Sequence, residues 1–301
     1  MKYYLAVDGG GTKTEFVWVN ERGMVVLKEL KGTSNPNDIG KDTMIADMVA
    51  YVKRKMPLDA DMVHICMGLS GLGFSGCKEE LANALRKIER VAFVDVCSDV
   101  QIALDSAYEK DGAIVIIGTG SVGYLRKNGE GALVGGCGYI IDSSLSGYDL
   151  GREVLNAVCS EKDGRGEKTL LSELVFAEKN TTIAELVKET YLYGKAYVAS
   201  FAPFVFTAYE QGDKAANEIL AKCVKEWERL LMGVYKRFGE EACEITLIGG
   251  LTKRFDVLSQ FLSAEITKKI SFKSPEKPIV YGALRRAGLL AERTFLESYR
   301  S

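Results

Sequence analysis

The sequence contains one histidine, His64, in 301 residues. A Ser-His-Asp triad needs a histidine as its base, and histidine-based metal sites usually need more than one, so the composition argues against both kinds of centre. His64 lies in the apolar, strand-like run 62–67. An imidazole that packs in the core or at a strand edge is therefore the favoured interpretation.

The chain also lacks any paired cysteine motif. It has an odd number of cysteines, seven, without a C-x-x-C pair or a close cluster. Most of them lie in apolar runs, where a free thiol behaves as a small hydrophobic side chain. This usage argues against a disulfide framework and indicates a reducing, cytoplasmic location. The seven are Cys66, Cys77, Cys97, Cys137, Cys159, Cys223 and Cys243.

No segment approaches the roughly 20 consecutive apolar residues of a membrane span, and the N-terminus runs directly into a strand rather than a signal peptide. The formal net charge is only -2, which gives no long-range attraction for nucleic acid or for an anionic membrane. We therefore expect neither as a partner. The hydrophobic content of 47% and the charged content of 27% are ordinary for a globular protein.

Two glycine-rich stretches, Asp8–Thr14 and Gly118–Ser121, each follow an apolar strand-like run. Glycines at the end of a strand allow a sharp turn and leave backbone N–H groups open to an anion. Two such turns that face one another could hold the phosphates of a nucleotide from both sides. Phosphoryl transfer is therefore the leading interpretation of this pair.

The first stretch has side-chain donors as well as bare backbone. The predicted phosphate contacts are Gly10, Gly11, Thr12, Lys13 and Thr14. A carboxylate would repel phosphate, so Asp8 fits such a site if Mg2+ or its water shell lies between them. An ordinary strand-to-strand turn is the alternative, and the Walker pattern G-x-x-x-x-G-K-[ST] is absent here.

In the second stretch, Thr119 and Ser121 are the expected side-chain donors, and Gly118 and Gly120 free the backbone. Taken alone, this stretch is equally typical of a hairpin turn and of a phosphate-binding loop. A third site, Gly249-Gly250, follows another apolar run and suits an adenine or ribose that lies against bare backbone. A tight strand-to-helix turn explains it equally well.

Asp99 follows a strand and begins a predicted helix. A carboxylate in the first helical turn is favoured by the helix dipole and needs no further explanation. The functional interpretation is a general base that accepts the proton of a hydroxyl as its oxygen attacks the γ-phosphorus of ATP.

Hydrophobic periodicity predicts a repeated plan of three strands followed by alternating strands and helices. Strands are expected over 3–8, 14–20 and 24–30, and the plan restarts near residue 112 with strands over 113–117, 121–126 and 131–135. A mainly helical stretch over 145–238 follows. The class is α/β, and the predicted domains are 1–109 and 110–301, the second with a helical insertion.

The order and spacing of these motifs resemble the sugar kinase/Hsp70/actin superfamily, and within it the N-acetylglucosamine kinase branch of the BadF/BadG/BcrA/BcrD-type ATPases. The resemblance covers nearly the whole chain. Narrower marks are Gly32-Thr33-Ser34-Asn35, Gly135-Gly136-Cys137-Gly138, Gly147-Tyr148 with Gly151-Arg152, Asp163–Gly166 with Thr169–Leu171, and Gln211-Gly212-Asp213.

The resemblance implies two ribonuclease-H-like domains of the actin-like ATPase fold, with ATP and a sugar in the interdomain cleft. It implies Asp99 as catalytic base, Asn35 as a sugar contact, and Asp8 as the residue that positions Mg2+ through water. Thr12 and Thr119 contact ATP phosphates, and Gly212 and Gly250 border the nucleotide. Homodimers are common in the family, and no residue here requires one.

One segment departs from the family. Relatives carry Gly-Gly-Trp-Gly and then Gly-Asp-Glu-Gly-Ser beside the sugar, where this chain has Cys137-Gly138 and then Asp142-Ser143-Ser144. Loss of a charged acceptor would weaken sugar binding by ~1.5–3 kcal/mol unless Asp142 substitutes for it. Cys137, Gly138, Asp142 and Ser143 are therefore the expected sugar neighbours, and N-acetylglucosamine is the first expected substrate.

Two other functions stay open at this level. One is an ATP-hydrolysing activator of a partner enzyme. A dimer of the family's activators holds an iron–sulfur cluster through cysteines near the domain interface; the seven cysteines here show no such arrangement, and one cysteine per subunit at a dimer interface stays open. The other is a sensor that binds ATP or sugar without turnover, which the altered 142–146 segment suggests.

Overall fold

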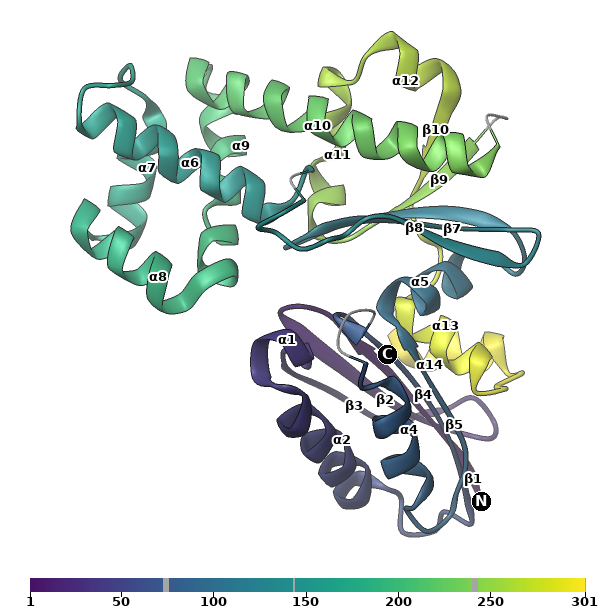
Figure 1. Ribbon diagram of the computed structural model, residues 1–301. Helices are drawn as coiled ribbons and strands as arrows, with labels where there is room; N and C mark the ends of the chain where they lie inside the picture. Colours follow the sequence, from purple (N-terminus) through teal and green to yellow (C-terminus); the bar gives the residue numbers. More distant parts are fainter. Residues whose placement is uncertain (73–75, 143, 240–242, 301) are drawn as a thin grey trace. The chain divides into compact units, whose positions relative to one another are not determined.

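A computed structural model describes residues 1–72, 76–142, 144–239 and 243–300. The chain divides into two compact units, each built around its own sheet (Figure 1). Unit 1 comprises Met1–Gly112 together with Pro275–Ser301, and unit 2 comprises Ala113–Ser274. No helix in the described part is long and apolar enough to cross a membrane.

Unit 1 contains a five-stranded mixed sheet in the order β3-β2-β1-β4-β5. The first three strands are antiparallel neighbours, and β4 and β5 continue the sheet in parallel with β1. The strands are β1 (Lys2–Gly9), β2 (Lys13–Asn20), β3 (Val25–Gly32), β4 (Met62–Leu69) and β5 (Val91–Ser98).

Helices cover both faces of this sheet, so its central strand is buried on both sides. In β1, Leu5 and Val7 pack against helices α2 and α4, while Tyr4 and Ala6 face α13 and α14. Helix α5 also contributes to the second face through Ile102. The helices are α1 (Pro36–Ile39), α2 (Lys41–Lys55), α4 (Lys78–Arg86), α5 (Asp99–Ala107), α13 (Ile279–Arg286) and α14 (Glu292–Arg300).

Unit 2 repeats the architecture. Its sheet has the order β8-β7-β6-β9-β10, which matches β3-β2-β1-β4-β5 position by position, with β6, β9 and β10 parallel. The strands are β6 (Gly112–Ile117), β7 (Ser121–Lys127), β8 (Glu130–Gly135), β9 (Cys243–Ile248) and β10 (Ile270–Lys273). The sequence predicts the first four and misses β10.

The expected helical stretch is five helices that share one hydrophobic core with this sheet. They are α6 (Gly147–Lys162), α7 (Leu170–Lys179), α8 (Ile183–Ala199), α9 (Ala202–Glu210) and α10 (Lys214–Phe238). Short elements complete the unit: η1 (Gly250–Arg254), α11 (Phe255–Leu258), η2 (Ser259–Phe261) and α12 (Ala264–Lys269).

The division differs from the predicted domain 110–301 at the C-terminal end, because residues from Pro275 onward pack on unit 1. Helix α13 approaches α5 so closely that a Cβ on Gly282 would lie 1.9 Å from the carbonyl oxygen of Ile102. The His64 ring nitrogen Nδ1 lies 2.8 Å from the carbonyl oxygen of Ala287. The only histidine therefore helps to hold this returning segment.

Candidate active site

The first glycine-rich stretch forms a tight turn between β1 and β2. The N–H of Gly10 donates to the carbonyl of Lys13 at 2.9 Å. Gly9 is required by packing, since a Cβ there would lie 2.4 Å from Ser34 Oγ. Thr12 and Lys13 are exposed at the turn, which suits them to contact a ligand.

Thr14 has a different environment from the one expected. Its side chain is 1% exposed, and its hydroxyl donates to the carbonyl of Gly32 at 2.9 Å. The hydroxyl therefore ties β2 to β3 beneath the turn, and this geometry favours a supporting role over direct contact with phosphate.

The structure brings Asp8 and Asp99 together at this turn. Asp8 lies at the end of β1, and burial raises its pKa from 3.8 to about 7, with the charges of Asp99 and Glu15 adding to the effect and Lys13 opposing it. Asp99 is the first residue of α5, after a capping box formed by Ser98 and Gln101. Its Oδ1 accepts the N–H of Val100 at 2.9 Å, in the first turn of the helix.

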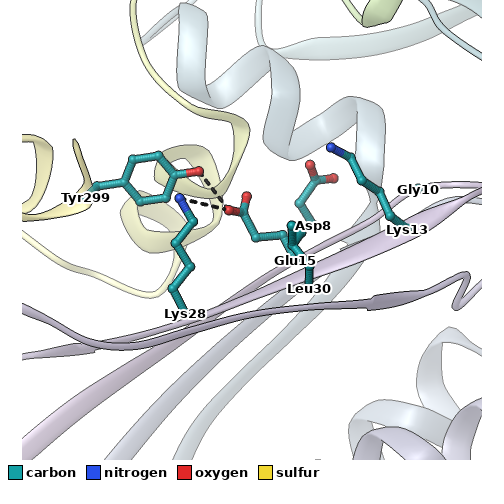
Figure 2. Close-up of a pocket in the computed structure, with 7 residues that line it drawn as sticks. All are labelled: Asp8, Gly10, Lys13, Glu15, Lys28, Leu30 and Tyr299. Atoms are coloured by element: carbon teal, nitrogen blue, oxygen red, sulfur yellow. Dashed lines mark hydrogen bonds and ion pairs between the residues drawn. The ribbon is translucent and has the colours of Figure 1, made fainter. Parts of the chain in front are cut away.

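Glu15 is a site residue that the motif alone does not reveal. It is the cross-strand partner of Asp8, so both side chains lie on one face of the sheet. Figure 2 shows its carboxylate turned toward Tyr299 and Lys28. The hydroxyl of Tyr299 donates to Glu15 Oε1 at 2.8 Å, and Lys28 Nζ lies 3.5 Å from the same oxygen.

A pocket of about 250 Å³ opens beside these residues within unit 1. The turn supplies one wall, and the last helix, α14, supplies Tyr299 (Figure 2). Two carboxylates and two ammonium groups are among its lining side chains, and such groups suit a small ionic ligand. It is lined by Asp8, Gly10, Lys13, Glu15, Lys28, Leu30 and Tyr299.

Asn35, the predicted sugar contact, caps α1. Its Oδ1 accepts the N–H of Asn37 at 2.9 Å, and its own N–H donates to Thr33 Oγ1. A Cβ on Gly71 would lie 2.2 Å from Asn35 Oδ1. The side chain is thus held in one orientation by the cap and by the close approach of the backbone at Gly71.

The second glycine-rich stretch joins β6 to β7 and is fixed by the start of α6. The N–H of Gly118 donates to the carbonyl of Gly120. The Gly118 carbonyl accepts the N–H of Gly147 at 2.7 Å, and the Thr119 carbonyl accepts that of Tyr148. The Gly147-Tyr148 motif therefore holds this loop in place through its backbone N–H groups.

Gly249 lies against the same loop. Its φ is 113°, and a Cβ there would lie 2.4 Å from the carbonyl oxygen of Ile117. Gly250 has open space at the Cβ position. Within unit 2 the structure thus joins two of the predicted nucleotide sites, Gly118–Ser121 and Gly249-Gly250.

Gly212 lies just after the C-terminal end of α9, at a φ of 81° and with open space where a Cβ would be. The next residue, Asp213, links two helices. It caps α10 through the N–H of Ala216, and it accepts hydrogen bonds from Thr169 Oγ1 and the N–H of Leu170 at the start of α7. The motifs Thr169–Leu171 and Gln211-Gly212-Asp213 are therefore in direct contact, because hydrogen bonds to Asp213 connect them.

The altered segment folds as a loop after β8. Gly138 has a φ of 95°, and its carbonyl accepts the N–H groups of Ile141 and Asp142. Asp142 Oδ2 accepts the N–H of Cys137 at 3.3 Å. Asp142 thus orders the loop from within, and Ser143, the remaining predicted sugar neighbour, lies outside the described residues.

A cysteine-containing cluster elsewhere in unit 1 has the spacing of metal ligands. Among the described residues it is the one group of three or more candidate ligands whose atoms lie within 4.8 Å of one another: Cys66, Asp95 and Cys97. Arg286 already pairs with Asp95 at 2.6 Å and with Asp105 at 2.9 Å. We therefore interpret Asp95 as the partner of Arg286 in an ion pair that holds α13 against the sheet, rather than as a metal ligand.

All seven cysteines lie in the described part and are free, and Cys137 is the exposed one among them.

Comparison with known proteins identifies the family. The model of the BadF/BadG/BcrA/BcrD ATPase family matches residues 5–284. The chain therefore belongs to the BadF/BadG/BcrA/BcrD ATPase family, as the motifs indicate.

Three curated relatives span nearly the whole chain. An N-acetylmuramic acid/N-acetylglucosamine kinase of Clostridium acetobutylicum is 29% identical, over 94% of this chain and 97% of its own length. An N-acetyl-D-glucosamine kinase of Dictyostelium discoideum is 30% identical, over 87% and 89%. A glucosamine kinase of Vibrio cholerae is 26% identical, over 96% of each chain.

Solved structures confirm the predicted fold class. A candidate N-acetylglucosamine kinase of Chromobacterium violaceum superposes with a TM-score of 0.76 at 22% identity, over 95% of this chain and 99% of that one. A glucokinase of Streptomyces griseus, solved with glucose and AMPPNP, gives a TM-score of 0.55 at 17% identity, over 97% and 99%. The α/β architecture with two five-stranded sheets is the one these sugar kinases have.

Proposed function

We propose that this chain is an ATP-dependent kinase that transfers the γ-phosphate of ATP to a hydroxyl of an amino sugar. The observation that carries the proposal is the pair of carboxylates Asp8 and Asp99, close enough in unit 1 for one charge to raise the pKa of the other, beside a turn of bare glycine backbone. The curated relatives are all kinases of amino sugars.

Asp99 is the general base in this proposal. It accepts the proton of the attacking hydroxyl as the bond from the sugar oxygen to the γ-phosphorus forms and the bond from that phosphorus to the leaving oxygen of ADP breaks. Its position in the first turn of α5, directly after the end of β5, places its carboxylate near the turn that is proposed to hold the phosphates.

Asp8 fits a role in holding Mg2+ through water. An ionised Asp8 would lie near the charges of Asp99 and Glu15, and carboxylate oxygens are the ligands that Mg2+ prefers. When bound, Mg2+ would neutralise part of the phosphate charge. Gly10, Gly11, Thr12 and Lys13 are the proposed phosphate contacts of unit 1.

In unit 2 the proposed contacts are Gly118–Ser121 for the phosphates, and Gly212, Gly249 and Gly250 around the nucleoside. The proposed sugar neighbours are Asn35 and Asp99 of unit 1 and Cys137, Gly138 and Asp142 of unit 2. Free thiols and the need for ATP support a cytoplasmic site of action. A homodimer stays a prediction, which sedimentation of the purified chain would check.

The proposal is tested by ADP release from ATP and Mg2+ across a panel of sugars. The panel contains N-acetylglucosamine, N-acetylmuramic acid, N-acetylmannosamine, glucosamine and glucose, with a control that has no sugar. We expect release that depends on an amino sugar, with N-acetylglucosamine the first candidate. Slow release that no sugar accelerates would contradict the kinase proposal and favour an ATPase or a sensor.

A further inference from the structure

The second glycine-rich loop has a neighbouring cation that the sequence motifs do not include. The Nζ of Lys195 lies 3.5 Å from the position that a Cβ would take on Gly120. The ammonium group is therefore in contact distance of the loop proposed to hold phosphate. Lys195 comes from α8, about 75 residues further along the chain, so no local pattern links the two.

A break in α8 precedes this lysine directly. Gly194 has φ 62° and ψ -140°, a combination that side-chain-bearing residues rarely adopt, and it interrupts the helix. The last turn of α8 therefore runs in a different direction from the turns before it. Lys195 is the first residue after the break.

The end of α8 is fixed to the same helix that seats the loop. A Cβ on Gly151 of α6 would lie 1.9 Å from the carbonyl oxygen of Val198, and one on Gly147 would lie 3.5 Å from Ala199 Cβ. Gly147 also donates its N–H to the loop at Gly118. The loop, the start of α6 and the end of α8 thus form one rigid joint, which sets the distance from Lys195 to Gly120.

The charge of Lys195 has no carboxylate partner in the described part of the chain. Other lysines of unit 2 do have one: Lys168 pairs with Glu173, and Lys214 pairs with Glu167. Lys195 instead lies 5.5 Å from the ring centroid of Tyr139. A half-buried ammonium beside bare glycine backbone is the arrangement that an anionic ligand would complete.

The loop itself offers a further unused donor. The Oγ of Ser121 is buried and has no hydrogen-bond partner among the described residues. A buried hydroxyl without a partner is costly unless a ligand or water satisfies it. Ser121 is thus an unsatisfied polar group of the same loop, although its Oγ is closed to solvent in this structure.

We propose that Lys195 is a phosphate-binding residue whose ammonium group contacts a phosphate oxygen of the ATP held at Gly118–Ser121. This inference rests on the proposed function, because it assumes that the loop binds a nucleotide. Lysine suits the role because its three N–H donors rotate freely around a compact charge. Tyr139 forms one side of the site and limits where the ammonium group can move.

The test compares Lys195→Gln and Lys195→Arg with the matched control Lys188→Gln. Lys188 is an exposed lysine on the same helix, so the control removes the same charge without touching the loop. The Kd of ATP is measured by calorimetry, and KM and kcat for ATP and for the sugar are measured by ADP release. Thermal unfolding checks that each variant is folded.

We expect Lys195→Gln to weaken ATP binding by ~10–100-fold, as for loss of a hydrogen bond to a charged group. Lys195→Arg should restore most of the affinity, the KM for sugar at saturating ATP should stay near that of the parent, and Lys188→Gln should change nothing. A Lys195→Gln protein that binds ATP as tightly as the parent would overturn the proposal. An equal loss in Lys188→Gln would do the same, since it would show a general charge effect.

The two proposals fail in different ways. If the parent protein binds ATP through Lys195 but no sugar stimulates ADP release, the kinase function fails and the phosphate contact stands. If sugar-dependent release is normal in Lys195→Gln at low ATP, the contact fails and the kinase function stands. A parent protein that binds no ATP contradicts both.

Discussion

The replacement Asp8→Asn should stabilise the free protein although it removes a proposed functional group. Burial together with the charges of Asp99 and Glu15 raises the pKa of Asp8 from 3.8 to about 7. Because one pKa unit corresponds to about 1.4 kcal/mol, ionised Asp8 destabilises the folded state by up to about 4 kcal/mol above pH 7. Local relaxation and water will reduce this, so we expect Asp8→Asn to raise the free energy of unfolding by ~1–3 kcal/mol at pH 8.

The sign of the pH dependence follows from which state holds the proton. Between pH 4 and pH 7 the folded chain keeps a proton on Asp8 that the unfolded chain has lost. The contribution of Asp8 to stability therefore falls as pH rises through this window and levels off above about pH 7. In Asp8→Asn that decline should be absent, and the two proteins should converge in stability near pH 4.

Urea unfolding at pH 4, 5, 6, 7 and 8 without Mg2+ measures this difference, and it tests unit 1, where Asp8 lies. The matched control is Asp47→Asn, since Asp47 is an exposed carboxylate on α2 of the same unit. Equal stability of Asp8→Asn and the parent at pH 8, or the same decline with pH in both, would refute the argument. A variant less stable than the parent at pH 8 would show that Asp8 makes favourable contacts that outweigh its burial.

Three further outcomes are expected. Asp99→Asn should fold and bind ATP but lose at least ~100-fold in kcat, as for removal of a general base; retained turnover would remove Asp99 from the mechanism. Activity should disappear in excess chelator and return with added Mg2+, and full activity in chelator would contradict the role given to Asp8. Gly9→Ala should lower the free energy of unfolding by ~1–3 kcal/mol in urea, because its Cβ would lie 2.5 Å from Leu69 Cδ2; an unchanged midpoint would show that Ser34 and Leu69 can move aside.

Much of the fold could be predicted because the central strands β1, β4, β6 and β9 are mainly apolar runs that end at or just before a glycine or a polar residue. The run before Gly118 is one example, and β6 is found there. The sequence does not reveal β10 because the strand is only four residues long, too short for its alternation of apolar and polar residues to stand out. The return of residues 275–301 to unit 1 was missed because it depends on contacts between helices far apart in sequence, which periodicity does not report.

A site residue can be predicted when it belongs to a local sequence motif. It cannot be predicted when its role depends on a contact with a residue that is far away in the sequence. Asp8 and Asp99 could be proposed because one lies near the end of a strand and the other directly follows one, and the structure brings both to one edge of the unit 1 sheet. Glu15 and Tyr299 are 284 positions apart in the sequence and meet only in the folded chain, so neither could be named from sequence. Thr14 was assigned to phosphate because the motif gives no information on burial, whereas the structure turns its hydroxyl to the carbonyl of Gly32.

Unit 1 is built from two segments that lie far apart in the sequence, and this limits when it can fold during synthesis. Because Pro275–Ser301 supplies part of one face of its core, including Phe295 at 0% exposed, that core cannot close until this segment has left the ribosome. Unit 2, whose residues are contiguous, can complete its own core earlier. The N-terminal segment of unit 1, synthesised first, would then be the last to finish folding, with the apolar side chains Tyr4, Ala6 and Val17 only partly covered in the meantime.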